Sequence, residues 1–386
     1  MTDDTSVDRP FWRYRIEQAW REAPIAWLSG PRRVGKTTLA RGLGAGEVRF
    51  LNCDLPSAHA MLRDPELFFR DVRTPIVVFD EVHQLADPSR VLKIGADEFP
   101  DLRILATGSS TLAASHKFRD TLTGRKREVH LAPVLWTELG AFDASIQRRL
   151  YHGGLPEALR SEAKQPTFYR EWMDSFFARD IQRLFGFRDF ARFDSLLEHV
   201  LRQSGGQLEK TRAAAALGIS RVTLENHLRA LEITHAVTIV RPFHRGGPQE
   251  IVRQPKVYAF DTGFVAYARG WDPLRPEDLG ILWEHVVLEH LHAHLPDRRV
   301  HYWRDKAGHE VDFVIPRGRD AVDAIECKWD PAELDGRSLA AFRARHPSGA
   351  NYLITPQVTP AWTRRVGGLE IRVGNPSLIQ ATTPAP

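Results

Sequence analysis

Short apolar runs alternate with amphipathic stretches from about residue 10 to about residue 130. The apolar runs are IAWLSG, EVRFLN, TPIVVFDE, LRILATG and REVHLAP, and stretches of helical period separate them. Such runs between helical stretches are typical of parallel strands that helices cover on both faces. The pattern therefore predicts an α/β fold with a parallel sheet in this part of the chain.

The pattern changes twice further along the chain. Residues from about 140 to 205 are predicted to be helical, and a helix, a turn, a helix and two strand candidates, AVTIVRPF and KVYAF, follow in winged-helix order. From about residue 264 a helical stretch precedes the strand candidates RVHYWR, EVDFVI, AVDAIECKW and NYLIT. We therefore expect an α/β multidomain protein with a core at 1–140, a helical segment at 141–190, a winged helix-turn-helix at 191–262, a second α/β domain at 263–375 and a flexible tail at 376–386.

Composition narrows the class of protein. The chain has 386 residues and a formal net charge of +4, and its sequence pI of about 9.1 permits an anionic partner without requiring one. Its two cysteines, Cys53 and Cys327, are far apart and form no CxxC pair, which argues against a disulfide framework or a zinc site and fits a reducing cytoplasm. No run approaches the roughly 18 apolar residues of a membrane span. We expect a soluble cytoplasmic protein without a targeting segment.

The run GPRRVGKTT, at residues 30 to 38, fits the pattern G-x-x-x-x-G-K-[ST] of a phosphate-binding loop. It follows an apolar strand and opens a helical stretch, which is the context that this motif requires. Glycines let backbone N–H groups wrap phosphates, Lys36 neutralises the terminal phosphates, and the Thr37 hydroxyl binds Mg²⁺. We expect ATP and Mg²⁺ as cofactors, with nucleotide contacts from Gly30, Pro31, Arg32, Arg33, Val34, Gly35, Lys36, Thr37 and Thr38.

Two acids and several hydroxyl groups follow later apolar runs. Asp80 and Glu81 end PIVVFDE in the Walker B arrangement, in which the first acid holds Mg²⁺ and the second polarises the attacking water. A solvated strand exit is the alternative. Thr107, Ser109 and Ser110 end RILATGSS, where they are placed to sense the γ-phosphate, although hydroxyl residues after a strand are usually caps.

Arg125, in LTGRKREV, precedes the fifth apolar run. It could act as an arginine finger on the phosphate of a neighbouring subunit, or it could belong to a solvated basic loop. The first interpretation implies a homo-oligomer that can form a ring. The predicted catalytic residues are Lys36, Asp80, Glu81, Thr107 and Arg125.

The segment GHEVDFVIPRGRDAVDAIECKWD, at residues 308 to 330, predicts a hairpin with several ionisable groups. Glu326 and Lys328 share one face of a strand, and a turn in PRGRD brings Asp312 close to opposite Glu326. On the preceding helix Glu284 lies in line with apolar positions, where an acid is costly unless it meets a metal or a partner. Glu284, Asp312 and Glu326 are therefore candidate metal ligands of a nuclease-like site, beside Lys328. Alternatively, Glu326 and Lys328 form a surface pair and Glu284 caps a loop.

These motifs together resemble a known family. GPRRVGKTT, VVFDE, LATGSS, LTGR, GGLPEAL, FFARDI, KVYAFDTGF and EVDFVI…IECK, in this order from about residue 10 to 355, are similar to prokaryotic AAA-type ATPases with a C-terminal restriction-endonuclease-like domain. The resemblance implies an AAA core related to the archaeal-ATPase and signal-transducing NTPase groups, a lid, a winged helix and a PD-(D/E)xK-type fold. It also implies that Gly154, Leu155 and Pro156 form a turn that contacts the nucleotide.

The second helix of the expected winged helix has a mixed outer face. Its leucines point inward, and Arg221, Glu225 and Arg229 point outward. The arginines suit phosphate contacts, but Glu225 between them is unfavourable near a DNA backbone. Two functions stay open: an ATPase that couples turnover to DNA binding or processing, and a nucleotide-dependent regulatory switch that binds protein partners without nuclease activity.

Overall fold

The computed structural model describes residues 7–44, 47–108, 121–185, 189–244, 254–357 and 360–380, with the side chains of Arg183, Leu184 and Gln380 left out. The chain divides into two compact units. The first consists of Met1–Ala132, Asp174–Phe187 and Ile233–His235, and the second of Pro133–Met173, Arg188–Glu232 and Ala236–Pro386. No helix in the described part of the chain is both long and apolar enough to cross a membrane.

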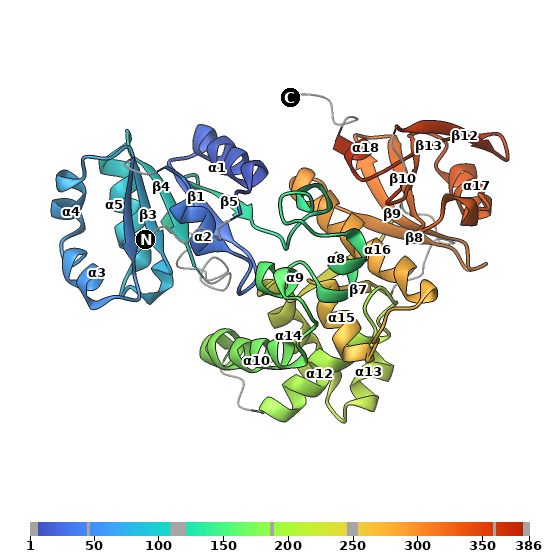
Figure 1. The fold of residues 1–386 in the computed structure, drawn as a ribbon, viewed down its shortest axis with the longest axis horizontal. Helices are drawn as coiled ribbons and strands as arrows, with labels where there is room; N and C mark the ends of the chain where they lie inside the picture. The colour runs from blue at the N-terminus through green and yellow to red at the C-terminus, as the bar shows by residue number, and fades with distance from the viewer. Residues whose placement is uncertain are drawn as a thin grey trace. The chain divides into compact units, whose positions relative to one another are not determined.

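The first unit is built on a five-stranded parallel sheet (Figure 1). Its strands are β1 (Ile25–Ser29), β2 (Val48–Asn52), β3 (Ile76–Asp80), β4 (Arg103–Thr107) and β5 (Lys126–His130), in the order β2-β3-β4-β1-β5. Every residue of β1 and β3 is buried, as expected for central strands covered on both faces. The parallel sheet predicted from the apolar runs is therefore confirmed, and β4 lies between β1 and β3.

Helices surround this sheet. In Figure 1, α1 lies beside β1 and β5, while α3, α4 and α5 gather near β3. The helical segments are α1 (Pro10–Glu22), α2 (Lys36–Arg41), α3 (Pro56–Met61), α4 (Pro65–Asp71), η1 (Val82–Gln84), α5 (Pro88–Glu98), the π-helical η3 (Phe177–Ile181) and α11 (Gln182–Phe185). The helix α10 (Pro166–Phe176) begins in the second unit and ends in the first.

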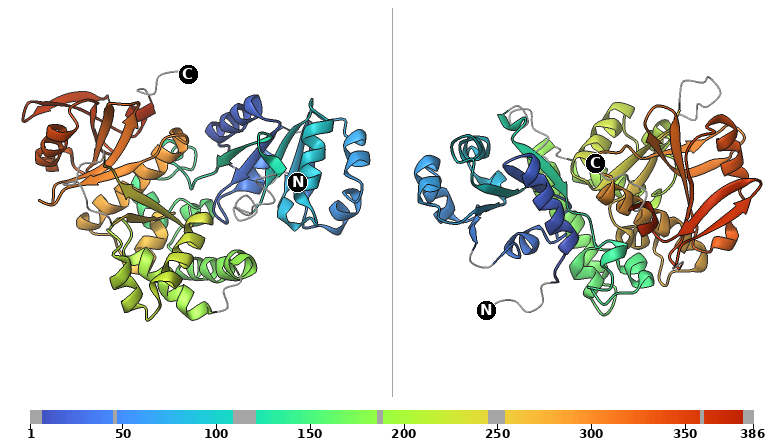
Figure 2. Two further views of the ribbon diagram at one scale, coloured as in Figure 1. Left: turned by 180° about the vertical axis from the view of Figure 1, so that it is seen from behind. Right: turned by 90° about the horizontal axis from the view of Figure 1, so that it is seen from above.

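The second unit contains an eight-stranded mixed sheet in the order β12-β13-β11-β10-β9-β8-β6-β7, with β12 and β13 in red at one end (Figure 2). Its strands are β6 (Val237–Pro242), β7 (Lys256–Ala259), β8 (His301–Arg304), β9 (Glu310–Arg317), β10 (Ala321–Cys327), β11 (Asn351–Ile354), β12 (Trp362–Val366) and β13 (Leu369–Gly374). An apolar core that includes Trp303, Phe342 and Leu353 packs between the sheet and α17 (Arg337–Arg345).

The other helical segments of the second unit precede or flank this sheet. They are η2 (Trp136–Glu138), α8 (Ile146–His152), α9 (Pro156–Arg160), α12 (Phe190–Arg202), α13 (Lys210–Ala216), α14 (Arg221–Ile233), α15 (Thr262–Arg269), α16 (Pro276–His294), η4 (Pro331–Glu333) and α18 (Ser377–Gln380). The long helix α16 packs against β10 and brings Glu284 towards the sheet.

The domain organisation differs from the expected one. The hairpin β6–β7 follows α14 as a wing would, but Arg241 and Pro242 at the end of β6 also pair in parallel with His301 and Tyr302 of β8. A free strand edge offers unpaired backbone groups, and β8 uses them. The winged helix and the C-terminal domain expected on either side of residue 262 thus share one sheet.

Two further boundaries also differ. The expected lid at 141–190 is divided, because Asp174–Phe187 belongs to the first unit. The expected flexible tail begins with an ordered helix, α18, whose Ile379 is buried. Residues 381–386 lie outside the described part of the chain.

Candidate functional site

The loop after β1 has a backbone path that glycine alone permits at two positions. Gly30 has φ of 140°, and a Cβ added there would lie 2.4 Å from the carbonyl oxygen of Leu131. Gly35 has φ of 99° and directly precedes Lys36, the first residue of α2. Side chains are strained at both angles, so the spacing of the two motif glycines follows from the shape of the loop.

Lys36 extends over this loop. Its Nζ donates hydrogen bonds to the carbonyl oxygens of Gly30, at 2.9 Å, and Pro31, at 3.0 Å. Burial lowers the pKa of Lys36, and the nearby acids Glu81 and Asp180 oppose that shift. The ammonium group is thus held beside the segment that the motif assigns to phosphates.

Asp80 is the point on which two hydroxyl groups converge. Thr37 Oγ1 donates to Asp80 Oδ2 at 2.9 Å, and Thr107 Oγ1 donates to Asp80 Oδ1 at 2.6 Å. This is possible because β4, which ends at Thr107, lies between the strand that leads to the loop and the strand that ends at Asp80. Hydroxyl and carboxylate oxygens are ligands that Mg²⁺ prefers, so Thr37 and Asp80 fit a magnesium ion that accompanies a nucleotide.

Glu81 has a backbone conformation that is uncommon for a residue with a side chain. Its φ of 56° turns the chain sharply after β3, and its N–H donates to Thr107 Oγ1 at 2.9 Å. Such positive φ angles occur more often at functional sites. Burial raises the pKa of Glu81, while Lys36 lowers it, and His83 Nδ1 lies 3.2 Å from Glu81 Oε2.

The structure adds Asp180 to this site, a residue that sequence reasoning did not assign to it. Arg32, in the loop, contacts Asp180 of η3, with Nη1 3.3 Å from Oδ2. The two residues are far apart in the sequence, so no local pattern connects them. The available signal was an acid within the mainly apolar FFARDI, where it follows Arg179.

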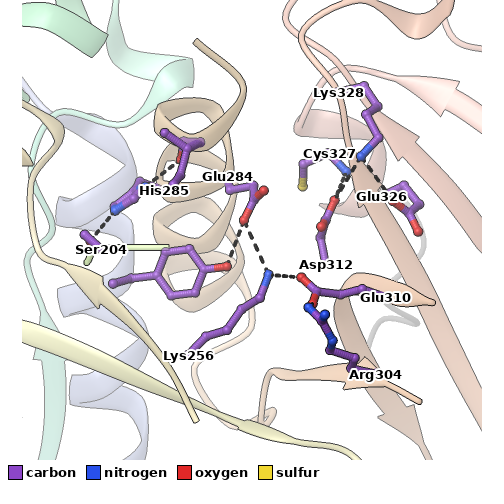
Figure 3. A network of polar contacts seen from close by, with 12 residues as sticks. Ser204, Lys256, Glu284, His285, Arg304, Glu310, Asp312, Glu326, Cys327 and Lys328 are labelled. Carbon is purple, nitrogen blue, oxygen red and sulfur yellow. Dashed lines mark hydrogen bonds and ion pairs between the residues drawn. The ribbon is translucent and has the colours of Figure 1, made fainter. Parts of the chain in front are cut away.

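In the second unit, β9 and β10 form the predicted hairpin. Ile325 pairs with Phe313 at the end of the ladder, and beyond it the N–H of Cys327 donates to Asp312 Oδ2 at 2.8 Å. Lys328 Nζ lies 3.8 Å from Asp312 Oδ2 and 3.5 Å from Glu326 Oε2. The structure therefore brings these three side chains together at one end of the hairpin (Figure 3).

Glu284 approaches the same region from α16, but a second lysine holds it. Lys256 of β7 places Nζ 3.8 Å from Glu284 Oε2 and 2.5 Å from Glu310 Oε1, and Tyr258 donates to Glu284 Oε2 at 2.9 Å (Figure 3). Arg304 also pairs with Glu310, at 2.8 Å. Lys256 and Glu310 were not among the predicted residues, because a lysine that opens a strand and an acid in a hairpin carry no motif of their own.

The predicted three-ligand metal site of Glu284, Asp312 and Glu326 stays a prediction. Among the residues that the structure describes, no three His, Cys, Asp or Glu side chains gather so that they could hold a metal ion. Glu284 is engaged by Lys256 and Tyr258, and Lys328 contacts both Asp312 and Glu326. Glu326 Oε1 is buried without a hydrogen-bond partner, so an acceptor stays available on Glu326.

Three family models match consecutive parts of the chain. The model described as an AAA domain matches residues 22–140, which contain β1 to β5, the phosphate-binding loop, Asp80, Glu81 and Thr107. Residues 22–140 are an AAA-type P-loop ATPase domain. The AAA domain is followed by matches to two models described as domains of unknown function, DUF8612 at residues 143–275 and DUF4143 at residues 279–367.

Similar whole proteins extend these matches. Two proteins described as uncharacterised, from Mycobacterium tuberculosis and Mycobacterium bovis, are each 29% identical over 316 residues, which is 78% of this chain and 69% of the relative. Among solved structures, a Walker-type ATPase of Pyrococcus abyssi matches 68% of this chain and 96% of its own, with 16% identity and a TM-score of 0.45. A RuvB variant of Thermotoga maritima matches 60% of this chain and 89% of its own, with 16% identity and a TM-score of 0.30.

Three further predicted residues of the AAA domain, Ser109, Ser110 and Arg125, remain to be placed. Ser109 and Ser110 lie outside the described residues. Arg125 precedes β5, and its carbonyl oxygen accepts from the N–H of Ile25 at the start of β1. The P-loop follows the opposite end of β1, so Arg125 and the loop lie at different ends of this strand. Its guanidinium pairs with Asp97, at 2.5 and 3.1 Å, and its action on a neighbouring subunit stays a proposal.

The turn at residues 153–156 is part of the core of the second unit. Gly154 N–H donates to Asp261 Oδ2 at 2.6 Å, and a Cβ on Gly154 would overlap the Arg149 guanidinium. Gly154 and Leu155 are buried, and Pro156 opens α9. The resemblance implied that this turn contacts the nucleotide, but here Gly154 and Leu155 are covered by their own unit.

The negative charge of Glu225 on the outer face of α14 is neutralised by neighbouring cations. Leu224, the first residue of the expected inner stripe, is buried. Glu225 pairs with Lys210 at 3.1 Å and with Arg221 at 3.3 Å, and the hydrogen bond from Lys210 is the main cause of its lowered pKa. These contacts remove part of the charge conflict that Glu225 would have beside a DNA backbone, but they also engage Arg221.

Proposed function

We propose that this chain binds and hydrolyses ATP with Mg²⁺ at the P-loop of its AAA domain. The observation that carries the proposal is the convergence of Thr37 and Thr107 on Asp80, beside a loop over which Lys36 is held. Magnesium would neutralise charge that develops on the phosphates. Thr37 and Asp80 would hold it, and Lys36 would neutralise the terminal phosphates.

Glu81 is the base in this proposal. Its carboxylate would accept a proton from the attacking water, because it follows Asp80 directly and its N–H is fixed by Thr107. Burial raises the pKa of Glu81, which makes its carboxylate a stronger base at neutral pH. His83, at 3.2 Å, limits the directions in which the carboxylate can turn.

The decisive experiment compares phosphate release by the wild type, Lys36→Ala and Lys93→Ala. Lys93 is an exposed lysine of α5 and serves as the matched control. We expect Lys36→Ala to lose ATP affinity and turnover while Lys93→Ala retains both. Normal ATP affinity and turnover in a folded Lys36→Ala protein would refute the proposal.

We further propose that nucleotide state acts on the second unit as a switch. This is favoured over Mg²⁺-dependent DNA cleavage because Lys256 and Tyr258 already engage Glu284, one of the three acids that a nuclease would use for metal. The partner would then be a protein bound by α14 or the mixed sheet. A restriction-endonuclease-like ancestry of that sheet, a ring-forming homo-oligomer and a DNA partner are compatible proposals.

One assay separates the two proposals. ATP turnover is measured with and without duplex DNA, and DNA cleavage with Mg²⁺ or Mn²⁺ is measured for the wild type and Asp312→Ala. The switch predicts that the wild type does not cleave DNA and that Asp312→Ala has the same ATP turnover as the wild type. Cleavage that Asp312→Ala abolishes would favour DNA processing.

A further inference from the structure

The contact between Arg32 and Asp180 places a carboxylate beside the phosphate-binding loop. Arg32 lies between Gly30 and Gly35, and its Nη1 is 3.3 Å from Asp180 Oδ2. Both side chains are partly buried. Asp180 is also close enough to Lys36 that it counteracts the effect of burial on that ammonium. Asp180 therefore faces two cations that the motif assigns to nucleotide binding.

A carboxylate in this position has two opposite effects on an incoming nucleotide. It repels the phosphates, because all of these groups are anionic. It also occupies Arg32, whose planar guanidinium is suited to bind phosphate oxygens in pairs. The nucleotide must therefore compete with Asp180 for the same guanidinium.

The segment that carries Asp180 has an unusual backbone and unusual connections. Phe177–Ile181 is π-helical, and π-helical turns occur often at functional sites. The preceding helix, α10, begins in the second unit, and the following helix, α11, lies in the first. Asp180 thus lies on the segment Asp174–Phe187, which belongs to the first unit although the chain before and after it belongs to the second.

We propose that Asp180 is a positioning residue of the nucleotide site, which holds Arg32 and yields it to the phosphates when ATP binds. The exchange changes the contacts of Phe177–Ile181, and the chain carries that change into α10, which directly precedes this segment and begins in the second unit. This inference rests on the proposed ATP site and names the residue through which that site would regulate the second unit.

The test measures the Kd of a fluorescent ATP analogue, and KM and kcat for ATP, in the wild type, Asp180→Asn and Asp174→Asn. Asp174 is exposed on the same segment, Asp174–Phe187, and is the matched control. Asp180→Asn keeps the shape of the side chain but removes its charge. We expect its Kd and KM for ATP to fall roughly three- to thirtyfold, as estimated for one like charge removed at short range, while Asp174→Asn matches the wild type.

A tighter complex is a result that a folding defect would not give. Because Asp180 acts through Arg32, we expect the gain in affinity to shrink when Asp180→Asn is combined with Arg32→Gln. Unchanged or weaker ATP binding in a folded Asp180→Asn protein would overturn the inference, as would a full gain in the double variant. If Lys36→Ala still abolishes binding in that case, the ATP site stands and only the role of Asp180 fails.

Discussion

At the scale of single residues, Thr107 does more than end a strand. Its hydroxyl donates to Asp80 Oδ1 and accepts from Glu81 N–H, so one buried group orients both acids of the site. A hydroxyl can do this because it is donor and acceptor at once. Thr107 therefore links the residue that would hold Mg²⁺ to the residue that would activate water.

Thr107→Val should show this linkage. Valine has nearly the same shape, but it leaves the partly buried Glu81 N–H without an acceptor and Asp80 without one donor. We expect a loss of about 1–3 kcal/mol in the free energy of unfolding, measured by urea denaturation, together with lower ATP turnover.

Thr74→Val is the matched control for that measurement. Thr74 Oγ1 is partly buried and donates to the carbonyl oxygen of Ile76, away from the acids. Its removal should lower stability less and leave turnover unchanged. Equal effects of the two substitutions would show that Thr107 has no special role.

At the scale of elements, ionic contacts join three pieces of the second unit. Lys256 from β7 lies between Glu284 of α16 and Glu310 of β9 (Figure 3). Lys256 is 4% exposed, and the acids raise its pKa although burial, the largest single influence, lowers it. The hairpin β6–β7 is thus attached to the rest of its sheet by charge as well as by the pairing of β6 with β8.

Lys256→Met should weaken this attachment. The substitution keeps the volume of the side chain but leaves two carboxylates without their shared ammonium. We expect the free energy of unfolding to fall by about 3 kcal/mol, the lower end of the range for breaking a buried pair, because the acids are partly exposed.

A double variant provides the control. Adding Glu310→Gln removes one of the stranded charges, so it should restore part of the stability that Lys256→Met loses, as thermal unfolding would show. If the single variant is as stable as the wild type, the lysine contributes nothing to holding the sheet together.

At the scale of the whole molecule, the features that could be predicted from the sequence are those set by residues close together in the chain. The apolar runs predicted the parallel sheet, and the motif spacing placed Lys36, Thr37 and Asp80 on neighbouring elements. Asp180 and Lys256 were missed because each meets its partners across long stretches of sequence. The joining of the wing hairpin to β8 was missed for a related reason: it depends on which strand edges meet after folding.

The stability of the molecule should also depend on pH through Glu284. Burial raises the pKa of Glu284 to about 7 from the usual 4.5, so the folded state holds this proton more tightly than the unfolded chain. The stabilisation is complete below pH 4.5 and is lost as pH rises towards 7, at up to about 1.4 kcal/mol per pH unit.

Glu284→Gln should remove this dependence. We expect its free energy of unfolding to change less between pH 4.5 and 7 than that of the wild type. Glu277→Gln, an exposed position of the same helix, should follow the wild-type curve. Parallel curves for Glu284→Gln and the wild type would contradict the assignment.

The central claim is that the AAA domain hydrolyses ATP with Glu81 as the base. The most direct measurement is ATP turnover by Glu81→Gln, with ATP binding measured on the same preparation. The predicted result is a protein that still binds ATP but turns it over about 10²- to 10⁴-fold more slowly, the usual contribution of a general base. Wild-type turnover in Glu81→Gln would contradict the claim.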